Sequence, residues 1–313
     1  MEQLLQWGLD LIRDIQSFAG PHLTSFMKFI TSFGGSLMFI IFLPLFYWSV
    51  SEKKGLRLYI MVLLSLWINI SLKYLLDQPR PFWEGYDPSL GIVYESMGGM
   101  PSGHSQNTLV MFIMIAAWAA SAVKKKWAAA CIYGCFGLFC FTVGFSRLYL
   151  GVHFPTDVIT GWAIGGILLC GYFLLNGKLE KCLSRRGFLT KIIAGLLVSL
   201  LYLIYLPNEE ALMPGGTMLG LCLGYCLNRR FVGFRISLDK ERAIWVRCLT
   251  IFLRLILGIA GMLLIFIVLS RYIPQDTGYH FPLIFIRDAI GGLWVSLAAP
   301  FIFVKLRLAK SLK

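Results

Sequence analysis

Long apolar stretches separated by short charged loops make up most of this chain. About nine of the stretches are long enough to cross the ~30 Å hydrocarbon core of a bilayer as helices that rise ~1.5 Å per residue. This pattern predicts an all-α fold, a polytopic transmembrane helical bundle with about nine spans. The predicted spans cover residues 34–50, 57–76, 105–122, 127–145, 157–176, 189–206, 213–228, 246–270 and 286–304.

The N-terminal residues follow a different pattern. Residues 3–18 place leucine and isoleucine at helical spacing among polar groups, and Gly20-Pro21 ends that helix. We therefore expect an amphipathic helix that lies in the membrane interface. The chain then divides into an N-terminal interfacial segment (1–33), a catalytic transmembrane core (34–206) and additional C-terminal transmembrane helices (207–313).

The composition agrees with a membrane protein. Of the 313 residues, 58% are hydrophobic and 14% are charged, and the mean hydropathy is +0.72. A soluble domain has too little interior to bury that much apolar surface. Most of the eight cysteines lie inside apolar stretches and lack zinc-ligand spacing, so we interpret them as packing residues and expect neither a metal nor a cofactor.

Charged residues divide the loops into two sets that alternate along the chain. Because basic loops are retained in the cytoplasm, the acidic loops are predicted to face outward. The same retention explains the net charge of +13, so no nucleic-acid partner is expected. The basic loops contain Lys53, Lys54, Arg57, Lys124, Lys125, Lys126, Lys178, Lys181, Arg185, Arg186, Arg229, Arg230, Arg235, Lys240, Arg242, Arg247, Lys305, Arg307, Lys310 and Lys313, and the acidic loops contain Asp77, Glu84, Asp87, Glu95, Glu209, Glu210 and Asp276.

Two polar clusters flank the third and fourth predicted spans. The first is Pro101-Ser102-Gly103-His104, and the second runs from Ser146-Arg147 through His153 to Asp157. Because the chain crosses the membrane twice between them, both clusters are expected on the same face, the outer one. In the last third of the chain we find no comparable polar cluster, and the spacing of Gly216, Gly220 and Gly224 predicts close helix packing there.

The side chains of these clusters suggest a site for a phosphate group. A guanidinium can bind two phosphoryl oxygens through its planar fork, and an ammonium supplies a point charge. Ser102 and Gly103 lie where a loop enters a helix, and the free N–H groups of a helix start bind anions. The three candidate cations are Lys73, Arg80 and Arg147.

The two histidines suggest acid–base and nucleophilic chemistry. His153 and Asp157 are four residues apart at the start of a predicted helix, so they can lie on one face. Asp157 could then accept a hydrogen bond from one imidazole nitrogen and leave the other free to attack phosphorus. His104 could protonate the leaving oxygen.

Each of these residues has a simpler explanation when it is considered alone. A histidine at a membrane interface is usually an interfacial residue, an aspartate at a helix start usually caps the helix, and an arginine at a helix end usually extends toward water. Their concentration on one membrane face favours a site, because ionisable groups at membrane helices are costly. His280, which lies between Tyr279 and Phe281, is interpreted as an interfacial residue.

Three motifs occur in order along residues 73–157. They are Lys73, six residues and Arg80-Pro81; then the PSGH sequence at 101–104; then Ser146-Arg147, five residues, His153, three residues and Asp157. With these motifs the chain resembles the type-2 phosphatidic acid phosphatase superfamily, and in particular its bacterial membrane lipid phosphate phosphatases.

The resemblance implies metal-independent hydrolysis of a phosphomonoester or diphosphate through a phosphohistidine. It implies that His153 is the nucleophile, that Asp157 orients it and that His104 is the acid. The phosphate-binding residues that it implies are Lys73, Arg80, Ser102, Gly103 and Arg147.

Two other functions share parts of this pattern. A lipid phosphotransferase would use an alcohol in place of water, and the sequence does not separate the two. A lipid or anion transporter would bind phosphate, but it needs no His–Asp pair with a second histidine.

We expect a protein of the bacterial inner (plasma) membrane whose site faces the periplasm and whose partners are the bilayer and a lipid phosphate. The sequence leaves open the oligomeric state and the choice among polyprenyl diphosphate, phosphatidate, phosphatidylglycerol phosphate and a sphingoid phosphate.

Overall fold

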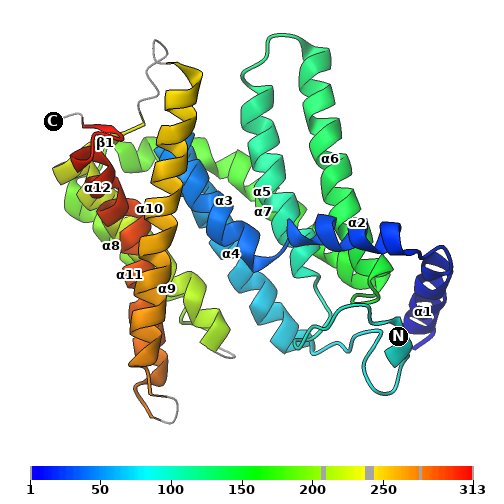
Figure 1. Ribbon diagram of the computed structural model, residues 1–313. Coiled ribbons are helices and arrows are strands. Elements are labelled where there is room, and N and C mark those ends of the chain that lie inside the picture. The colour runs from blue at the N-terminus through cyan, green and yellow to red at the C-terminus, as the bar shows by residue number, and fades with distance from the viewer. Residues whose placement is uncertain (1, 206–208, 237–242, 275–276, 312–313) are drawn as a thin grey trace. The chain divides into compact units, whose positions relative to one another are not determined.

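The computed structural model describes residues 2–205, 209–236, 243–274 and 277–311, and it is mostly helical (Figure 1). The described chain forms two compact units, each built from two stretches of sequence. Unit 1 contains residues 1–39 and 64–177, and unit 2 contains residues 40–63 and 178–313. Lys240, Arg242, Asp276 and Lys313 of the charged loops, and the predicted boundary at 206–207, lie outside the described residues.

Unit 1 carries both polar clusters. Its helices are joined by one long connection, residues 77–102, which contains a single short 3₁₀ turn. The elements of unit 1 are α1 (Glu2–Ser17), α2 (Pro21–Ser32), the second half of α4 (Glu52–Leu76), η1 (Pro88–Leu90), α5 (Gly103–Ala120), α6 (Lys126–Tyr149) and most of α7 (Pro155–Ser184).

Unit 2 contains most of α3 (Ser36–Ser49), the first half of α4 and the C-terminal helices. Two strands of two residues each pair antiparallel in it, a small exception to the predicted all-α fold. The remaining elements are α8 (Phe188–Leu201), η2 (Glu209–Ala211), α9 (Leu212–Leu227), η3 (Asn228–Val232), β1 (Phe234–Arg235), α10 (Ile244–Arg271), α11 (His280–Leu293), η4 (Trp294–Ala298), α12 (Ala299–Lys305) and β2 (Lys310–Ser311).

Five helical stretches in the described part of the chain are long and apolar enough to cross a membrane. They are α4, α6, α7, α10 and the continuous stretch His280–Lys305. The number rises to six if α2 and α3, which meet at a bend of 49°, form one span. These helices support an integral membrane protein, but the predicted nine spans are not confirmed.

Helix length and polarity explain why three predicted spans are not among these helices. The stretches predicted at 189–206 and 213–228 form α8 and α9, which have 14 and 16 residues, whereas a perpendicular crossing needs ~20. The stretch predicted at 105–122 forms α5, whose first turns are polar. Hydropathy counts apolar side chains, but it does not show how many consecutive residues stay helical.

The polar first turns of α5 are buried against α4 by a hydrogen-bond network. Gln106 donates to the backbone oxygen of Ser65 (2.8 Å) and accepts from Asn69 Nδ2 (3.0 Å). Ser65 Oγ donates to Asn107 Oδ1 (2.6 Å). Because buried polar groups are stable only when they are hydrogen-bonded, these side chains fix the register between the two helices. They therefore fix the position along α4 at which α5 begins.

The predicted amphipathic helix at the N-terminus is confirmed as α1. Its buried side chains, Leu5, Leu9 and Ile12, form a cluster with Leu90 and Phe154. The apolar face of α1 therefore packs on the two loops that carry the polar clusters of unit 1.

The glycines of α9 serve the predicted close packing. A Cβ on Gly216 would lie 3.0 Å from Cβ of Asp288 on α11, and a Cβ on Gly220 would collide with the backbone oxygen of Ala289. The absence of side chains at these positions lets α9 and α11 approach closely, as in other membrane helix pairs.

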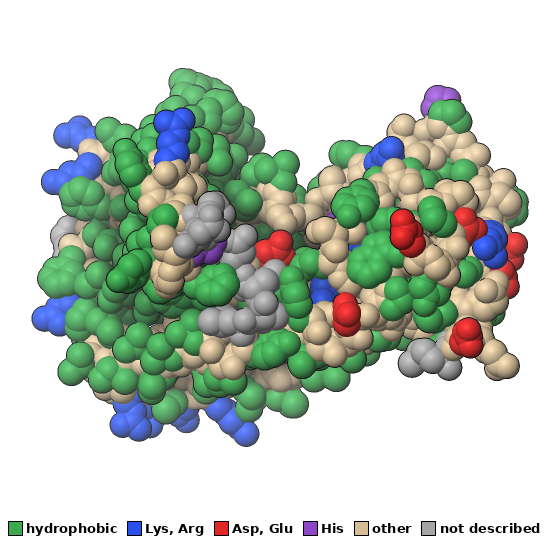
Figure 2. Space-filling model, turned by 90° about the horizontal axis from the view of Figure 1, so that it is seen from below, with side chains coloured by type: hydrophobic (Ala, Val, Ile, Leu, Met, Phe, Trp, Pro, Cys, Tyr) green, Lys and Arg blue, Asp and Glu red, His purple; other side chains and the backbone are tan. Residues whose placement is uncertain are grey.

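Large hydrophobic side chains are exposed along the long helices of both units. Examples are Leu138 and Phe141 on α6, Ile167 on α7 and Leu264 on α10. Hydrophobic side chains cover much of the face shown in Figure 2. Apolar surface on this scale is expected where helices contact lipid.

Candidate active site

The two polar clusters that are separated by α5 and α6 in the sequence meet in unit 1. The backbone N–H of Ser102, at the start of α5, donates to the backbone oxygen of Asp157 in the first turn of α7 (2.9 Å). Gly151, with φ of +68°, turns the chain between the end of α6 and His153, and a side chain there would collide with the carbonyl group of Leu90. The structure therefore places Ser102, His153 and Asp157 together, as the sequence predicts.

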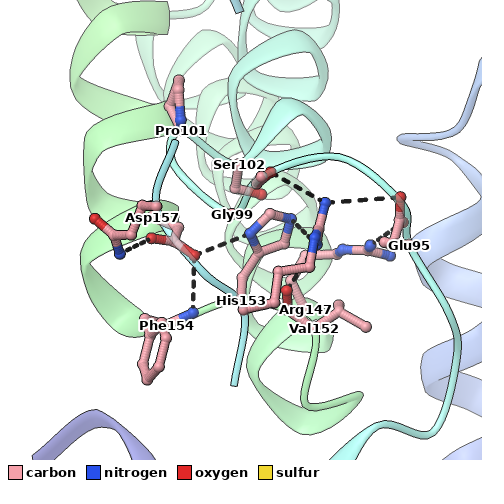
Figure 3. A network of polar contacts seen from close by, with 12 residues as sticks. Glu95, Gly99, Pro101, Ser102, Arg147, Val152, His153, Phe154 and Asp157 are labelled. Carbon is pink, nitrogen blue, oxygen red and sulfur yellow. Dashed lines mark hydrogen bonds and ion pairs between the residues drawn. The ribbon is translucent and has the colours of Figure 1, made fainter. Parts of the chain in front are cut away.

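His153 and Asp157 form a hydrogen-bonded pair. His153 Nδ1 lies 3.1 Å from Asp157 Oδ2, and the backbone N–H of Phe154 donates to the same oxygen (2.9 Å), as Figure 3 shows. Gln78 donates to the other carboxylate oxygen (2.9 Å). Asp157 therefore accepts a hydrogen bond at the start of α7, as a capping residue does, and also pairs with His153.

The free side of the His153 ring faces Arg80. Arg80 Nη1 lies 3.3 Å from His153 Nε2 and also donates to the backbone oxygen of Val152 (2.7 Å). Burial lowers the pKa of Arg80 to about 10, which still leaves it charged at neutral pH. Burial, and then the charges of Arg80 and Lys73, lower the pKa of His153 well below its usual 6.5. The imidazole is therefore neutral at pH 7 and keeps a lone pair on Nε2.

Lys73 points from the last turn of α4 toward the end of the long loop. Its Nζ donates to the backbone oxygens of Gly98 (2.5 Å) and Gly99 (3.0 Å). A Cβ on Gly99 would lie 2.8 Å from Asp157 Oδ2, so only glycine lets this loop pass so close to the carboxylate. Lys73 thereby lies beside the His153–Asp157 pair.

Arg147 approaches the site from the last turn of α6 with its side chain 1% exposed. Its Nη1 donates to Thr31 Oγ1 (2.7 Å) and its Nη2 donates to Glu95 Oε1 (2.5 Å). Its Nε is buried without a hydrogen-bond partner among the described residues. A buried N–H of a guanidinium that lacks an acceptor is costly, and an oxygen of a bound anion would supply one.

Glu95 is the main charged residue that the sequence does not identify as part of this site. It accepts a hydrogen bond from Arg147 Nη2, and its second oxygen lies 3.9 Å from Arg80 Nη2. Among the acidic residues of the loop at 77–102, the sequence carries no signal that singles it out. With Lys73, Arg80 and Arg147 set against Glu95 and Asp157, the cluster keeps a net positive charge, which favours an anionic ligand.

The PSGH segment supplies the start of α5. Ser102 caps the helix, since its Oγ accepts from the backbone N–H (3.4 Å) and from Oγ (3.0 Å) of Ser105. A Cβ on Gly103 would lie 2.8 Å from Asn69 Oδ1, so close packing also requires glycine here. The free N–H groups of this helix start favour an anion beside them.

His104 lies in the same first turn and packs against the turn that follows α2. A Cβ on Gly34 would come 2.8 Å from His104 Cδ2. Burial, and then the charges of Arg147, Lys73 and Arg80, lower the pKa of His104 well below its usual 6.5, and the negative charge of a bound phosphate would oppose this shift. The eight residues predicted from the sequence thus gather in one region of unit 1, while Thr31, Gly34, Gln78 and Glu95 were not predicted.

Within the described residues, no group of three or more His, Cys, Asp and Glu side chains is arranged to hold a metal ion. The cationic side chains are the only strong positive charges that the described part of the site offers.

Two family models match the chain. The PAP2 superfamily model matches residues 54–181, and the model described as "PAP2 superfamily phosphatase, transmembrane extension" matches residues 212–311. The first match contains all eight predicted site residues.

Several curated proteins are similar to this chain. Phosphatidylglycerophosphatase B of Bacillus subtilis (strain 168) is 33% identical over 172 residues, which are 51% of this chain and 77% of that protein. Sphingosine-1-phosphate phosphatase 1 of Rattus norvegicus is 29% identical over 254 residues, or 77% of this chain and 57% of that protein. Glucose-6-phosphatase 3 of the same organism is 27% identical over 218 residues, or 64% and 62%.

The chain thus spans little more than half the length of the two rat proteins. The two model matches together cover most of the chain, and the three motifs fall inside the first of them. The chain belongs to the PAP2 superfamily, with a catalytic-type domain followed by the transmembrane extension of that superfamily.

Proposed function

We propose that this protein is a membrane phosphatase that hydrolyses the phosphomonoester or diphosphate group of a lipid through a phosphohistidine on His153. The observation that carries the proposal is the ring of His153, which has Asp157 on Nδ1 and Arg80 beside Nε2. One nitrogen is held by a carboxylate, and the other faces the cation that would bind the phosphoryl oxygens.

In the first step, the Nε2 lone pair attacks phosphorus and the bond between phosphorus and the ester oxygen breaks. Asp157 stabilises the positive charge that develops on the ring, and His104 gives its proton to the leaving alkoxide. In the second step, water attacks the phosphohistidine, and His104 takes the proton of that water. The P–N bond breaks, phosphate leaves and both histidines return to their first state.

The cations stabilise the charge on the transferring phosphoryl group. We assign Lys73, Arg80 and Arg147 to its oxygens, with the hydroxyl of Ser102 and the N–H of Gly103 at the start of α5 beside them. Because these charges are fixed by burial and hydrogen bonds before substrate binds, the chemistry needs no metal.

A lipid is the substrate class that the surroundings favour. Unit 1 exposes large apolar side chains on α6 and α7, such as Phe141 and Ile167, and two of the relatives are named for phospholipid or sphingolipid phosphates. The third is named for glucose 6-phosphate, so water-soluble phosphate esters are the necessary comparison.

We further propose that the site faces the periplasm of a bacterium, because the acidic loop at 77–102 carries part of it and the basic residues Lys124, Lys125 and Lys126 lie at the opposite ends of α5 and α6.

Phosphate release by purified protein in detergent tests the proposal. The panel contains phosphatidate, phosphatidylglycerol phosphate, sphingosine 1-phosphate, a polyprenyl diphosphate and glucose 6-phosphate, each with and without a lipid alcohol. Release from at least one lipid is expected. A preference for glucose 6-phosphate would refute the lipid substrate, transfer to the alcohol would indicate a phosphotransferase, and binding without release would indicate a carrier.

A further inference from the structure

Residues 2–35 lie outside both family matches, yet they contact the candidate site. This N-terminal segment consists of α1, α2 and the turn at residues 33–35. It touches the site at three places, through Gly8 on Phe154, Thr31 on Arg147 and Gly34 on His104. In Figure 1, α1 and α2 both lie at the end of α6 that carries Arg147.

The contact between Thr31 and Arg147 is the one that reaches a phosphate-binding group directly. Thr31 Oγ1 accepts a hydrogen bond of 2.7 Å from Arg147 Nη1. Glu95 accepts from the other terminal nitrogen (2.5 Å). A planar guanidinium that is held at both terminal nitrogens has a fixed orientation, so these two partners also fix the direction of the unpartnered Nε–H.

We propose that Thr31 is a positioning residue of the active site, which holds the guanidinium of Arg147 in the orientation that binds phosphate. The inference rests on the proposed phosphate site and adds a residue from outside the matched domain to it. Thr31 acts through Arg147 and need not touch the substrate.

Thr31 is itself held in place on both sides. One face of α2 packs on the end of α6, where Thr24 Oγ1 and the hydroxyl of Tyr149 share a hydrogen bond of 2.7 Å and Met27 joins an apolar cluster with Tyr149. After Thr31, the ring of Phe33 packs edge-on against Phe139 with centroids 5.4 Å apart. Thr31 therefore sits on a helix that is anchored before and after it.

A purely structural role for Thr31 is the competing explanation. In that case the hydroxyl would only satisfy a buried arginine, and its removal would lower stability without changing phosphate affinity per folded molecule. Thr24 offers a matched control. Like Thr31, it lies on α2 and makes a hydrogen bond of 2.7 Å to a residue of α6, but that residue, Tyr149, binds no phosphate in our proposal.

The test compares Thr31→Val, Thr31→Ser and Thr24→Val in the full-length protein in detergent. We measure kcat and KM for phosphatidate, the inhibition constant of orthovanadate, and the rise in unfolding temperature that orthovanadate causes. Thr31→Val should raise KM and the inhibition constant about tenfold, as expected for the loss of a hydrogen bond to a charged group, and should reduce the thermal shift. Thr31→Ser should restore values close to wild type, and Thr24→Val should change neither constant by more than about twofold.

An unchanged vanadate inhibition constant in Thr31→Val, or an equal change in Thr24→Val, would overturn the proposal. If Thr31→Val does not fold, Thr31→Ala removes the hydroxyl without putting a methyl group in its place. The same measurements on Thr31→Ala then decide the question. The thermal shift with orthovanadate does not need turnover. A wild-type protein that binds orthovanadate but hydrolyses no lipid phosphate would therefore refute the proposed function and still test the role of Thr31.

Discussion

The guanidinium of Arg80 lies 3.3 Å from Nε2 of His153, the ring nitrogen that points away from Asp157. A fixed cation at this distance opposes protonation of the ring and attracts the phosphoryl oxygens that the same nitrogen would attack. The contact therefore serves both the protonation state of the proposed nucleophile and the placement of its target.

This contact predicts the acid side of the pH profile. The pKa of His153 is lowered by its burial and by the nearby cations. The ring therefore stays neutral down to a pH below 6.5. The acid limb of kcat/KM, which reports groups of the free enzyme, should lie below pH 6.5 after correction for the substrate phosphate, whose second pKa is about 6. A limb centred at or above 6.5 would contradict a neutral, buried nucleophile.

Replacement of His153 tests the mechanism itself. His153→Ala should lower kcat by more than about a thousandfold, because it removes the attacking nitrogen and leaves the cations in place. Wild-type protein quenched during turnover of radiolabelled substrate should carry an acid-labile phosphate on His153. His22→Ala is the control, since His22 is exposed on α2, and it should retain wild-type activity. Substantial turnover in His153→Ala would rule out this nucleophile.

A chelator should leave the activity unchanged. Three buried cations already surround the proposed phosphate position, and we assign the stabilisation of its charge to them. Orthovanadate should inhibit competitively, because its bipyramidal adduct resembles the phosphoryl transition state. We would measure initial rates after treatment with EDTA and after addition of Mg²⁺ or Zn²⁺. Complete inhibition that a metal reverses would show that the cations alone do not suffice.

The packing of α1 on Phe154 predicts a remote effect on catalysis. A Cβ on Gly8 would lie 2.8 Å from Phe154 Cδ1, and the backbone N–H of Phe154 donates to Asp157. Gly8→Leu should displace Phe154 and with it the His153–Asp157 pair, which should lower kcat about tenfold or more. Gly137→Leu is the matched control, because a Cβ on Gly137 of α6 meets nothing within 4 Å. Equal kcat values for the two variants, at equal folded fractions, would show that α1 does not position the site.

The sidedness of the site can be tested with two exposed serines. Ser89 lies on the long loop that carries the site residues, and Ser184 lies at the last residue of α7. In a variant without the native cysteines, a membrane-impermeant thiol reagent should label Ser89→Cys in intact cells and should not label Ser184→Cys, because basic loops stay in the cytoplasm. Labelling in the reverse order would move the site to the cytoplasmic face, and labelling of both would mean that the number of crossings between them is wrong.

The predicted number of spans is not confirmed, because the apolar pattern and the length of the helices differ in several places. Hydropathy identifies apolar residues, but α8 ends after 14 residues. The start of α5 is polar because Gln106 and Asn107 are satisfied by Ser65 and Asn69 of α4. A linear count cannot distinguish a residue that faces lipid from one that is buried against another helix.

The sequence by itself determined the helical membrane character and the parts of the site that depend on short-range spacing. The four-residue separation of His153 and Asp157 and the PSGH turn at a helix start create their geometry locally, because a helix places such residues on one face or at one end. The tertiary structure alone decided which residues bind the charged side chains of the site. Thr31 and Glu95 reach Arg147 across 116 and 52 residues, and Gln78 reaches Asp157 across 79 residues. Contacts over such separations depend on how helices and loops pack, and a lone threonine, glutamate or glutamine carries no pattern that reveals its partner.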